Sequence, residues 1–229
     1  MVRALNYLLL VLTCTAVLGL SACSPETGEP NKSRSYTGGS ASPSAVPATT
    51  ALAPEVRSPE AQADLDGRLI RAAKANDSVQ VTELISAGGN VNAKDSIQDS
   101  AFLYAGAEGF NDVLQLTIAA GADVASTNRY GGTALIPASE HGHTDTVSIL
   151  IAAGVPVNHV NNLGWTAMQE AILLNNGNAR QQEVVRQLLA AGADPGIRDP
   201  EGHTALDNAQ RLGFVEIAAI IQESSPPAG

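Results

Sequence analysis

A repeat with a period of 33 residues is the feature that most restricts how this chain can fold. The segment Ala-Gly-Gly-Asn-Val-Asn at 87–92 returns as Ala-Gly-Ala-Asp-Val at 120–124, and then twice more. The glycines of this segment are spaced by 33, 33 and 38 residues, at Gly88, Gly121, Gly154 and Gly192. A second register agrees, with spacings of 33, 33, 33 and 38 residues, at Gly67, Ser100, Thr133, Thr166 and Thr204. This self-similarity indicates a stack of about five like units, because one unit cannot bury its own apolar face.

Apolar residues inside each unit recur at helical spacing. In the second half of the units, one apolar face is built from the pairs Val81 and Leu84, Leu114 and Thr117, Val147 and Leu150, and Val185 and Leu188. In the first half, an alanine recurs at Ala72, Ala105, Ala138, Ala171 and Ala209. Aromatic residues make up only 3% of the chain, so the core has to be assembled from small and aliphatic side chains. The pattern therefore predicts an all-α fold of closely packed helix pairs.

The expected helix ends are marked by residues with known capping roles. Thr133, Thr166 and Thr204 are expected to cap the first helix of their units, at about 1 kcal/mol each. The repeated glycine is expected to end each second helix in the left-handed conformation. The last unit has polar Gln222 where earlier units have Ile or Leu, which fits an end face that no further unit covers.

The third unit carries the clearest family pattern. Its sequence at 128–143 is Asn-Arg-Tyr-Gly-Gly-Thr-Ala-Leu-Ile-Pro-Ala-Ser-Glu-His-Gly-His, and Ala153-Gly154 follows. This resembles the ankyrin family, which implies a solenoid of helix-turn-helix units with short β-hairpin-like tips. The implied domain spans 60–224, with units of about 62–94, 95–127, 128–160, 161–198 and 199–224. Every unit lacks the proline and the histidine of the family pattern, so we expect a weaker hydrogen-bond network between units.

The N-terminus has the layout of a secretory signal. Residues 1–22 contain one positive charge at Arg3, an apolar stretch, and then small residues. The end of this segment, Leu20-Ser21-Ala22-Cys23, resembles the bacterial lipobox, which implies that Cys23 becomes the lipidated first residue of the mature chain. The alternative is an ordinary cleaved signal with an incidental cysteine. The other cysteine, Cys14, would be removed with the signal, so no internal disulfide is expected.

The segment 23–59 is rich in Ser, Pro, Thr, Ala and Gly and lacks aliphatic periodicity. It is expected to be a disordered tether between the lipid on Cys23 and the repeats, or simply a tolerated spacer. Residues 225–229 form a short tail. Together these features predict a lipid anchor in the cell membrane, on the periplasmic or cell-surface side.

Charge and motif content limit the classes of function. The chain has 13 basic and 23 acidic residues, a formal charge of −10, which disfavours nucleic acid as a partner. We find no phosphate-binding glycine loop, no nucleophile motif and no thiolate pair, and expect no cofactor. The candidate metal or catalytic group is Glu140, His141 and His143, but Gly-His at this position belongs to the ordinary family pattern, so we expect neither a metal site nor enzyme activity.

The family resemblance implies that partners bind on the concave side, at the tips and on exposed positions of the first helices. By position, the tips supply Ile97, Arg129, Tyr130, Leu163, Trp165, Glu201 and His203. The first helices supply Glu108, Glu140, His141, Leu173, Leu174 and Arg211. Tyr130, Leu163 and Trp165 stand out because Trp and Tyr dominate binding energy at interfaces. The alternative is that Trp165 packs against its own tip.

The fourth unit has five extra residues, within 175–182. This insertion is either a contact loop or a tolerated insertion. The sequence thus predicts a monomeric, membrane-tethered module that binds a protein partner. The runner-up is a structural or chaperone-like envelope lipoprotein with broad, weak contacts, and a hydrolase comes third.

Overall fold

Residues 57–224, the part of the chain that the computed structural model describes, form five helix pairs. The predicted signal segment, Cys23 and the tail 225–229 lie outside the described residues, as does the predicted tether up to residue 56. The helices are α2 (Pro59–Lys74), α3 (Ser78–Ser86), α4 (Ala101–Glu108), α5 (Asn111–Ala119), α6 (Leu135–Glu140), α7 (Thr144–Ala152), α8 (Ala167–Leu173), α9 (Ala179–Ala190), α10 (Ala205–Leu212) and α11 (Val215–Ser224). Unit one is α2 and α3, and each later unit adds the next pair.

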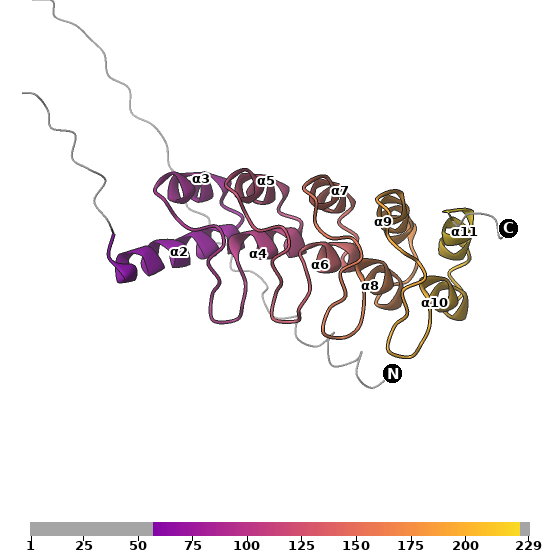
Figure 1. Cartoon of the computed structure of the whole chain (residues 1–229). Helices are drawn as coiled ribbons and strands as arrows, with labels where there is room; N and C mark the ends of the chain where they lie inside the picture. The colour runs from indigo at the N-terminus through magenta and orange to yellow at the C-terminus, as the bar shows by residue number, and fades with distance from the viewer. Residues whose placement is uncertain (1–56, 225–229) are drawn as a thin grey trace, which may run out of the picture. The chain divides into compact units, whose positions relative to one another are not determined.

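The helix pairs stack into two rows. The second helices (α3, α5, α7, α9 and α11) form one row and the first helices form the other, while the loops between units extend beyond the first helices (Figure 1). Leucine side chains from both rows form the core: Leu69, Leu114, Leu135, Leu150 and Leu188 are all fully buried. The five recurring alanines are buried as well, so adjacent first helices can approach closely.

The helix ends confirm most of the capping predictions. Thr166 and Thr204 accept a hydrogen bond from the backbone N–H three residues later, and Ser100, which was not predicted as a cap, does the same. The glycines after the second helices are left-handed, with φ between 84° and 88°. Gln222 is exposed, as expected for an end face.

The prediction for Thr133 is wrong. Its hydroxyl is buried and has no hydrogen-bond partner among the described residues, and α6 begins only at Leu135. The cause is Pro137, which has no N–H to donate to the carbonyl of Thr133. The N–H of Ile136 donates to that carbonyl instead, at 3.2 Å, and therefore does not donate to the Thr133 hydroxyl.

An amide side chain links the loops of neighbouring units. Asn92 donates to the carbonyl of Gly121 and accepts from the N–H of Asp123, at 3.1 and 2.7 Å. Asn158 makes the same two bonds to Gly192 and Asp194, at 3.3 and 2.8 Å. We call this two-bond arrangement the amide clamp. It fixes the stacking register at the surface, away from the core.

Helix α2 supplies the same clamp to unit one. It is 16 residues long and begins at Pro59, inside the segment assigned to the tether, where later units have a loop and a tip. Gln62 donates to the carbonyl of Gly88 at 3.0 Å, and Asp66 accepts from the N–H of Asn90 at 2.8 Å. The extra turns of α2 thus take the place of a preceding unit.

The insertion of unit four is held by hydrogen bonds. Asn175 donates to the carbonyl of Glu140 at 2.7 Å, and Gln181 donates to Asn175 at 3.0 Å. Residues 179–182 belong to α9, so part of the insertion lengthens this helix. Gln169, which stands at the position of the family histidine, donates to the carbonyl of Ile197 at 2.9 Å and so still links unit four to unit five.

Candidate partner-binding surface

Four tips precede the first helices of units two to five, at 95–99, 128–132, 161–165 and 199–203. In each tip the first residue donates its N–H to the carbonyl four residues later and accepts from the N–H three residues later, at 2.9–3.0 Å. These turns are hairpin-like, but no β-strand is assigned within residues 57–224. A carboxylate or amide therefore recurs at the first position, where its side chain can bind the turn: Asp95, Asn128, Asn161 and Asp199.

The side chain of that first residue makes each tip rigid. Asn128 accepts from the N–H groups of Tyr130 and Gly132, at 2.9 and 3.0 Å. Asn161 accepts from the N–H groups of Leu163 and Trp165, at 3.0 and 3.1 Å. These bonds within the tip hold its backbone in one conformation.

The tips of units three and four are joined to each other. The N–H of Asn162 donates to the carbonyl of Tyr130 at 2.9 Å, and the imidazole Nε2 of His159 lies 2.6 Å from the carbonyl of Gly131. These contacts bring Tyr130 and Leu163 together on one fixed surface. The guanidinium of Arg129 lies 4.7 Å from the centre of the Tyr130 ring.

The predicted binding residues differ in how far they reach solvent. Ile97 and Leu163 are 48% and 39% exposed, and Arg129 and His141 are exposed. Half-buried side chains are those of Tyr130, Glu140, Trp165, Leu173, Leu174 and His203. The indole N–H of Trp165 is buried and has no hydrogen-bond partner among the described residues. Trp165 thus combines a supporting position in its tip with a partly accessible ring, and Leu163 is the more accessible of the two.

A chain of charges crosses the tips of units two and three, and sequence reasoning found only its last member. The ammonium of Lys74 lies 2.7 Å from Asp95 and 3.0 Å from Asp99, and Arg129 lies 3.3 Å from Asp99. Burial alone would lower the pKa of Lys74, but the two carboxylates outweigh it and raise the pKa. No local pattern in the sequence marks these residues, because they are brought together only when units one to three stack.

A buried carboxyl lies beneath the tip of unit four and was also missed. Glu170 is 6% exposed, and Asn161 donates to it at 2.7 Å. Burial raises the pKa of Glu170 to about 8, and the negative charge of Glu140 adds to this effect. Burial raises the pKa of Glu140 too, against the opposing effect of His141. Glu170 is therefore mostly protonated at neutral pH. The equivalent residue of unit five, Asn208, is also buried and donates to its tip residue Asp199 at 2.8 Å.

The group considered for metal chemistry does not converge. The rings of His141 and His143 lie 5.5 Å apart, and Nδ1 of His141 lies 2.9 Å from the carbonyl of Ala107 in unit two. Burial lowers the pKa of His143, with added repulsion from His141 and Arg180. Residues 57–224 contain no group of three or more His, Cys, Asp or Glu side chains placed to hold a metal ion.

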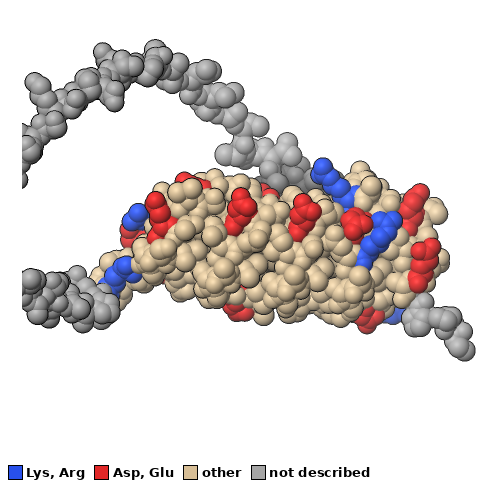
Figure 2. All heavy atoms as spheres, turned by 90° about the horizontal axis from the view of Figure 1, so that it is seen from above, with Lys and Arg blue, Asp and Glu red and all other residues tan. Residues whose placement is uncertain are grey.

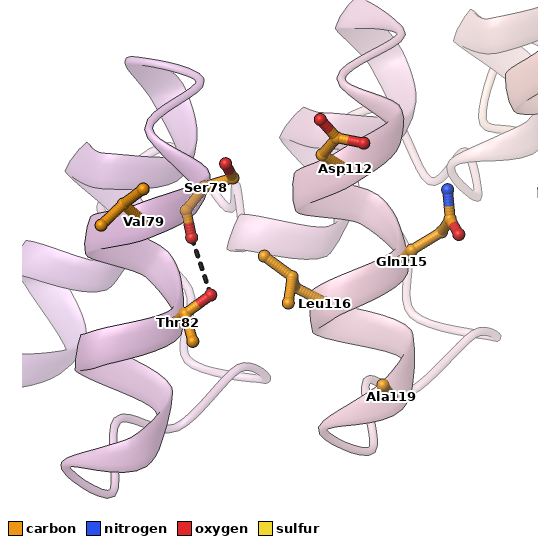
Figure 3. A pocket seen from close by; sticks show the side chains of 7 residues that line it. All are labelled: Ser78, Val79, Thr82, Asp112, Gln115, Leu116 and Ala119. Carbon is orange, nitrogen blue, oxygen red and sulfur yellow. Dashed lines mark hydrogen bonds between the residues drawn. The ribbon is translucent and has the colours of Figure 1, made fainter.

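The face formed by the second helices, on the other side of the solenoid from the tips, differs from the tips in its side chains. The row of second helices is mostly uncharged, with separate acidic side chains spaced along it and basic side chains toward the ends of the stack (Figure 2). A groove of about 610 Å³ lies between α3 and α5, where Val79 is 69% exposed and Asp112 is the charged residue of the lining (Figure 3). The Thr82 hydroxyl in this groove donates to the carbonyl of Ser78 at 2.8 Å. Its side chains do not converge on one point, in contrast to those of the linked tips.

No helix within residues 57–224 has the length and apolar character needed to cross a membrane.

Comparison with known proteins identifies one family. The sequence matches the family model described as ankyrin repeats (three copies) over residues 69–159 and 102–199, which together cover more than half of the chain. The Escherichia coli (strain K12) protein YahD, described as an ankyrin repeat protein, is 46% identical over 52 residues. That match covers 23% of this chain and 26% of YahD, so the chain spans about a quarter of this relative's length.

Two solved structures share the fold. The crystal structure of an ankyrin repeat domain from Acinetobacter baumannii AYE is 54% identical, with a TM-score of 0.67, and the match covers 68% of this chain and 80% of that one. The ankyrin repeat protein EF0377 is 40% identical, with a TM-score of 0.66, over 68% of this chain and 79% of that one.

Proposed function

This chain belongs to the ankyrin-repeat family, and from this premise we propose that it binds one protein partner through the linked tips of units three and four. Ankyrin repeats generally mediate protein–protein interaction. The observation that carries the proposal is the bond between Asn162 and Tyr130, which holds two tips and their apolar side chains in one arrangement before any partner arrives. Such preorganisation lowers the entropic cost of binding.

The second part of the proposal concerns location. We propose that Cys23 carries a lipid that anchors the protein to a membrane on its extracytoplasmic side. The support is the segment Leu20-Ser21-Ala22-Cys23 after an apolar stretch, together with the tether-like composition of 24–56. The test is labelling of cells with a fatty-acid analogue: the wild-type protein incorporates the label and Cys23→Ala does not. Equal labelling of the two proteins would contradict the anchor.

The binding proposal is tested with Tyr130→Ala combined with Leu163→Ala. Neither side chain belongs to the buried core, so we expect the melting temperature to stay within a few degrees of the wild-type value. Affinity capture from solubilised envelopes is expected to lose one dominant protein. The matched control is Val79→Ala, which removes an exposed apolar side chain from the second-helix row and should keep the captured protein.

The alternative of a structural or chaperone-like lipoprotein gives a different result. In that case many proteins are captured weakly, and the tip variant changes none of them selectively. A hydrolase would require the group around His141. Activity lost on His141→Ala would support that third reading against both others.

A further inference from the structure

The first unit has no tip, and this leaves a groove at the N-terminal end of the stack. The groove has a volume of about 530 Å³ and lies between α2 and residues 93–95, which lead into the tip of unit two. Its floor is made of Ala63, Gly67 and Ile70, and the charged residues that line it include Arg71 and Lys94. The row of second helices does not contribute to it.

Arg71 is exposed in this groove because of where it stands in the repeat. In unit four the equivalent residue is Glu170, which is buried beneath its own tip by Asn161. In unit five it is Asn208, which is buried and donates to Asp199 of its tip at 2.8 Å. Helix α2 occupies the place of a tip in unit one, so within residues 57–224 no tip residue covers Arg71, which is exposed.

The absence of a side chain at Gly67 lets the guanidinium of Arg71 lie on the floor of the groove. The other four units have Ser or Thr at this register position, whereas unit one has glycine. A methyl group added at Gly67 would lie 3.3 Å from Nη1 of Arg71, so the guanidinium folds back one helical turn into the space that the missing side chain leaves. The replacement of Ser or Thr by Gly67 therefore makes room for the guanidinium of Arg71.

The acidic side chains of the groove are already engaged, while two of its cations lack a carboxylate partner. Asp66 accepts from Gln62 and from the N–H of Asn90. Asp95 is paired with Lys74 and accepts two backbone N–H groups of its tip. Among residues 57–224, no carboxylate forms an ion pair with Arg71 or Lys94. Lys94 donates to the carbonyl of Thr127 at 2.7 Å, which leaves its charge uncompensated.

The distribution of charge along the stack favours the same end. Residues 57–94 contain five basic and five acidic side chains, whereas residues 95–224 contain five basic and fifteen acidic ones. A negatively charged segment is therefore repelled by units two to five and least opposed at unit one. Of the two ends of the solenoid, the N-terminal one is the electrostatically accessible end for an acidic ligand.

We propose that the groove between α2 and residues 93–95 binds the carboxylate side chains of an acidic peptide segment, with Arg71 as the principal contact and Lys94 as the second charge. The planar guanidinium suits two parallel bonds to one carboxylate, and the floor of Ala63 and Gly67 lets an extended chain lie close to the helix. This inference rests on the proposed protein-binding function and names the chemistry of a second contact, separate from the linked tips.

The test measures binding of a fluorescein-labelled peptide of four Glu-Ala repeats to the detergent-solubilised full chain, by fluorescence anisotropy at low salt. A Gln-Ala peptide of the same length is the neutral counterpart. We expect saturable binding of the acidic peptide only, weakened at least tenfold by Arg71→Gln. Arg68→Gln removes the same charge from the same helix outside the groove lining and should change the affinity less than threefold.

A second variant separates a binding defect from loss of folding. Gly67→Ala adds a methyl group 3.3 Å from Nη1 of Arg71, which moves the guanidinium off the groove floor by a few tenths of an ångström, and alanine also favours the helix. We therefore expect weaker peptide binding together with an unchanged or higher melting temperature. Equal effects of Arg71→Gln and Arg68→Gln would overturn the proposal, as would equal binding of the two peptides or no saturable binding. The variant Tyr130→Ala with Leu163→Ala should keep peptide binding, so failure at the tips and failure at the groove are distinguishable.

Discussion

At the scale of single residues, the position four residues after the helix cap shows how one place in a repeat can hold different chemistry. It is Arg71, Tyr104, Pro137, Glu170 and Asn208 in successive units. In units four and five, a carboxyl and an amide exchange places between this position and the first residue of the tip. The pair Asn161 and Glu170 in unit four becomes Asp199 and Asn208 in unit five. What is kept is a bond between the tip and the helix beneath it, and the residue types follow from that geometry.

Glu170 makes stability depend on pH in a defined direction. Its pKa is about 8 in the folded chain and near 4.5 in the unfolded chain, so between these values the folded state holds the extra proton. The stability that Glu170 contributes is thus complete below pH 4.5 and is lost as pH rises toward 8. We expect the free energy of unfolding to fall by up to about 1.4 kcal/mol per pH unit between pH 5 and 7 through this group.

The measurement is urea denaturation of wild type and Glu170→Gln at pH 5, 6 and 7. Glutamine keeps an oxygen that accepts from Asn161 but does not titrate, so the difference between the two proteins should shrink or reverse as pH rises. Glu108→Gln, at an exposed position on a first helix, is the control and should follow wild type. Parallel pH profiles for wild type and Glu170→Gln would show that Glu170 is not the titrating group.

At the scale of elements, helix α2 shows what a terminal unit needs. Its first turns carry Ser58 as N-cap and Pro59 and Glu60 at the start, a standard helix-opening signature. These turns then provide Gln62 and Asp66, which reproduce the amide clamp that Asn92 and Asn158 supply elsewhere. An end unit is therefore stabilised by the same contacts as an inner unit, made from a different element.

Removal of this clamp should loosen unit one selectively. We expect Gln62→Ala with Asp66→Ala to lower the free energy of unfolding by about 1–3 kcal/mol, since two hydrogen bonds between α2 and the loop after α3 are lost. Native-state hydrogen exchange should show the largest loss of protection at the amide of Asn90. Asp64→Ala, on the exposed side of the same helix, should leave that amide protected. An unchanged exchange rate in the double variant would refute the role of the clamp.

Helix periodicity made most elements predictable, and the failures have physical reasons. The paired helices and the alanine contacts follow from a local pattern that recurs in all five units, and the left-handed glycines from one that recurs in the first four. The late start of α6 was missed because two local signals conflict: Thr133 favours a cap, and Pro137 removes the N–H that would complete the first turn. The helix-opening residues 58–60 lie at the boundary of segment 23–59, whose composition predicts a tether.

The candidate site was predictable only in outline. The sequence placed Tyr130 and Leu163 in adjacent tips, but the bond that joins those tips links residues 32 positions apart and depends on how the units stack. The same holds for Lys74 with Asp95 and Asp99. Burial of the Trp165 indole N–H likewise depends on the packed structure and has no local signature.

At the scale of the whole described stack, stability is the sum of the units and the junctions between them, because each unit contacts only its neighbours. The amide clamp joins α2 to the loop of unit one, unit one to unit two, and unit three to unit four. Among the described residues it is missing between units two and three, and also between units four and five, where Gly196 stands at the position of Asn92 and Asn158. At the junction of units two and three, Ala125 stands at the position of Asn92 and Asn158. Pro156 stands at the position of Asp123 and Asp194 and has no N–H for a clamp side chain to accept. Since both halves of the clamp are lost at the junction of units two and three, restoring both residues tests what the clamp contributes there.

Installing the clamp should strengthen that junction, and only the double change can do so. In Ala125→Asn with Pro156→Asp, the new amide can donate to the carbonyl of Gly154 and accept from the N–H at 156, as Asn92 does with Gly121 and Asp123. Two exposed hydrogen bonds contribute about 1 kcal/mol each, and loss of the proline costs about 0.4–1 kcal/mol through the unfolded chain. We expect a net gain of about 1 kcal/mol in the free energy of unfolding, measured by equilibrium denaturation.

The two single variants are the controls. Pro156→Asp alone should destabilise the protein, and Ala125→Asn alone should be close to neutral. A double variant no more stable than the sum of the two single changes would mean that the two residues do not interact and that the clamp does not form at this junction.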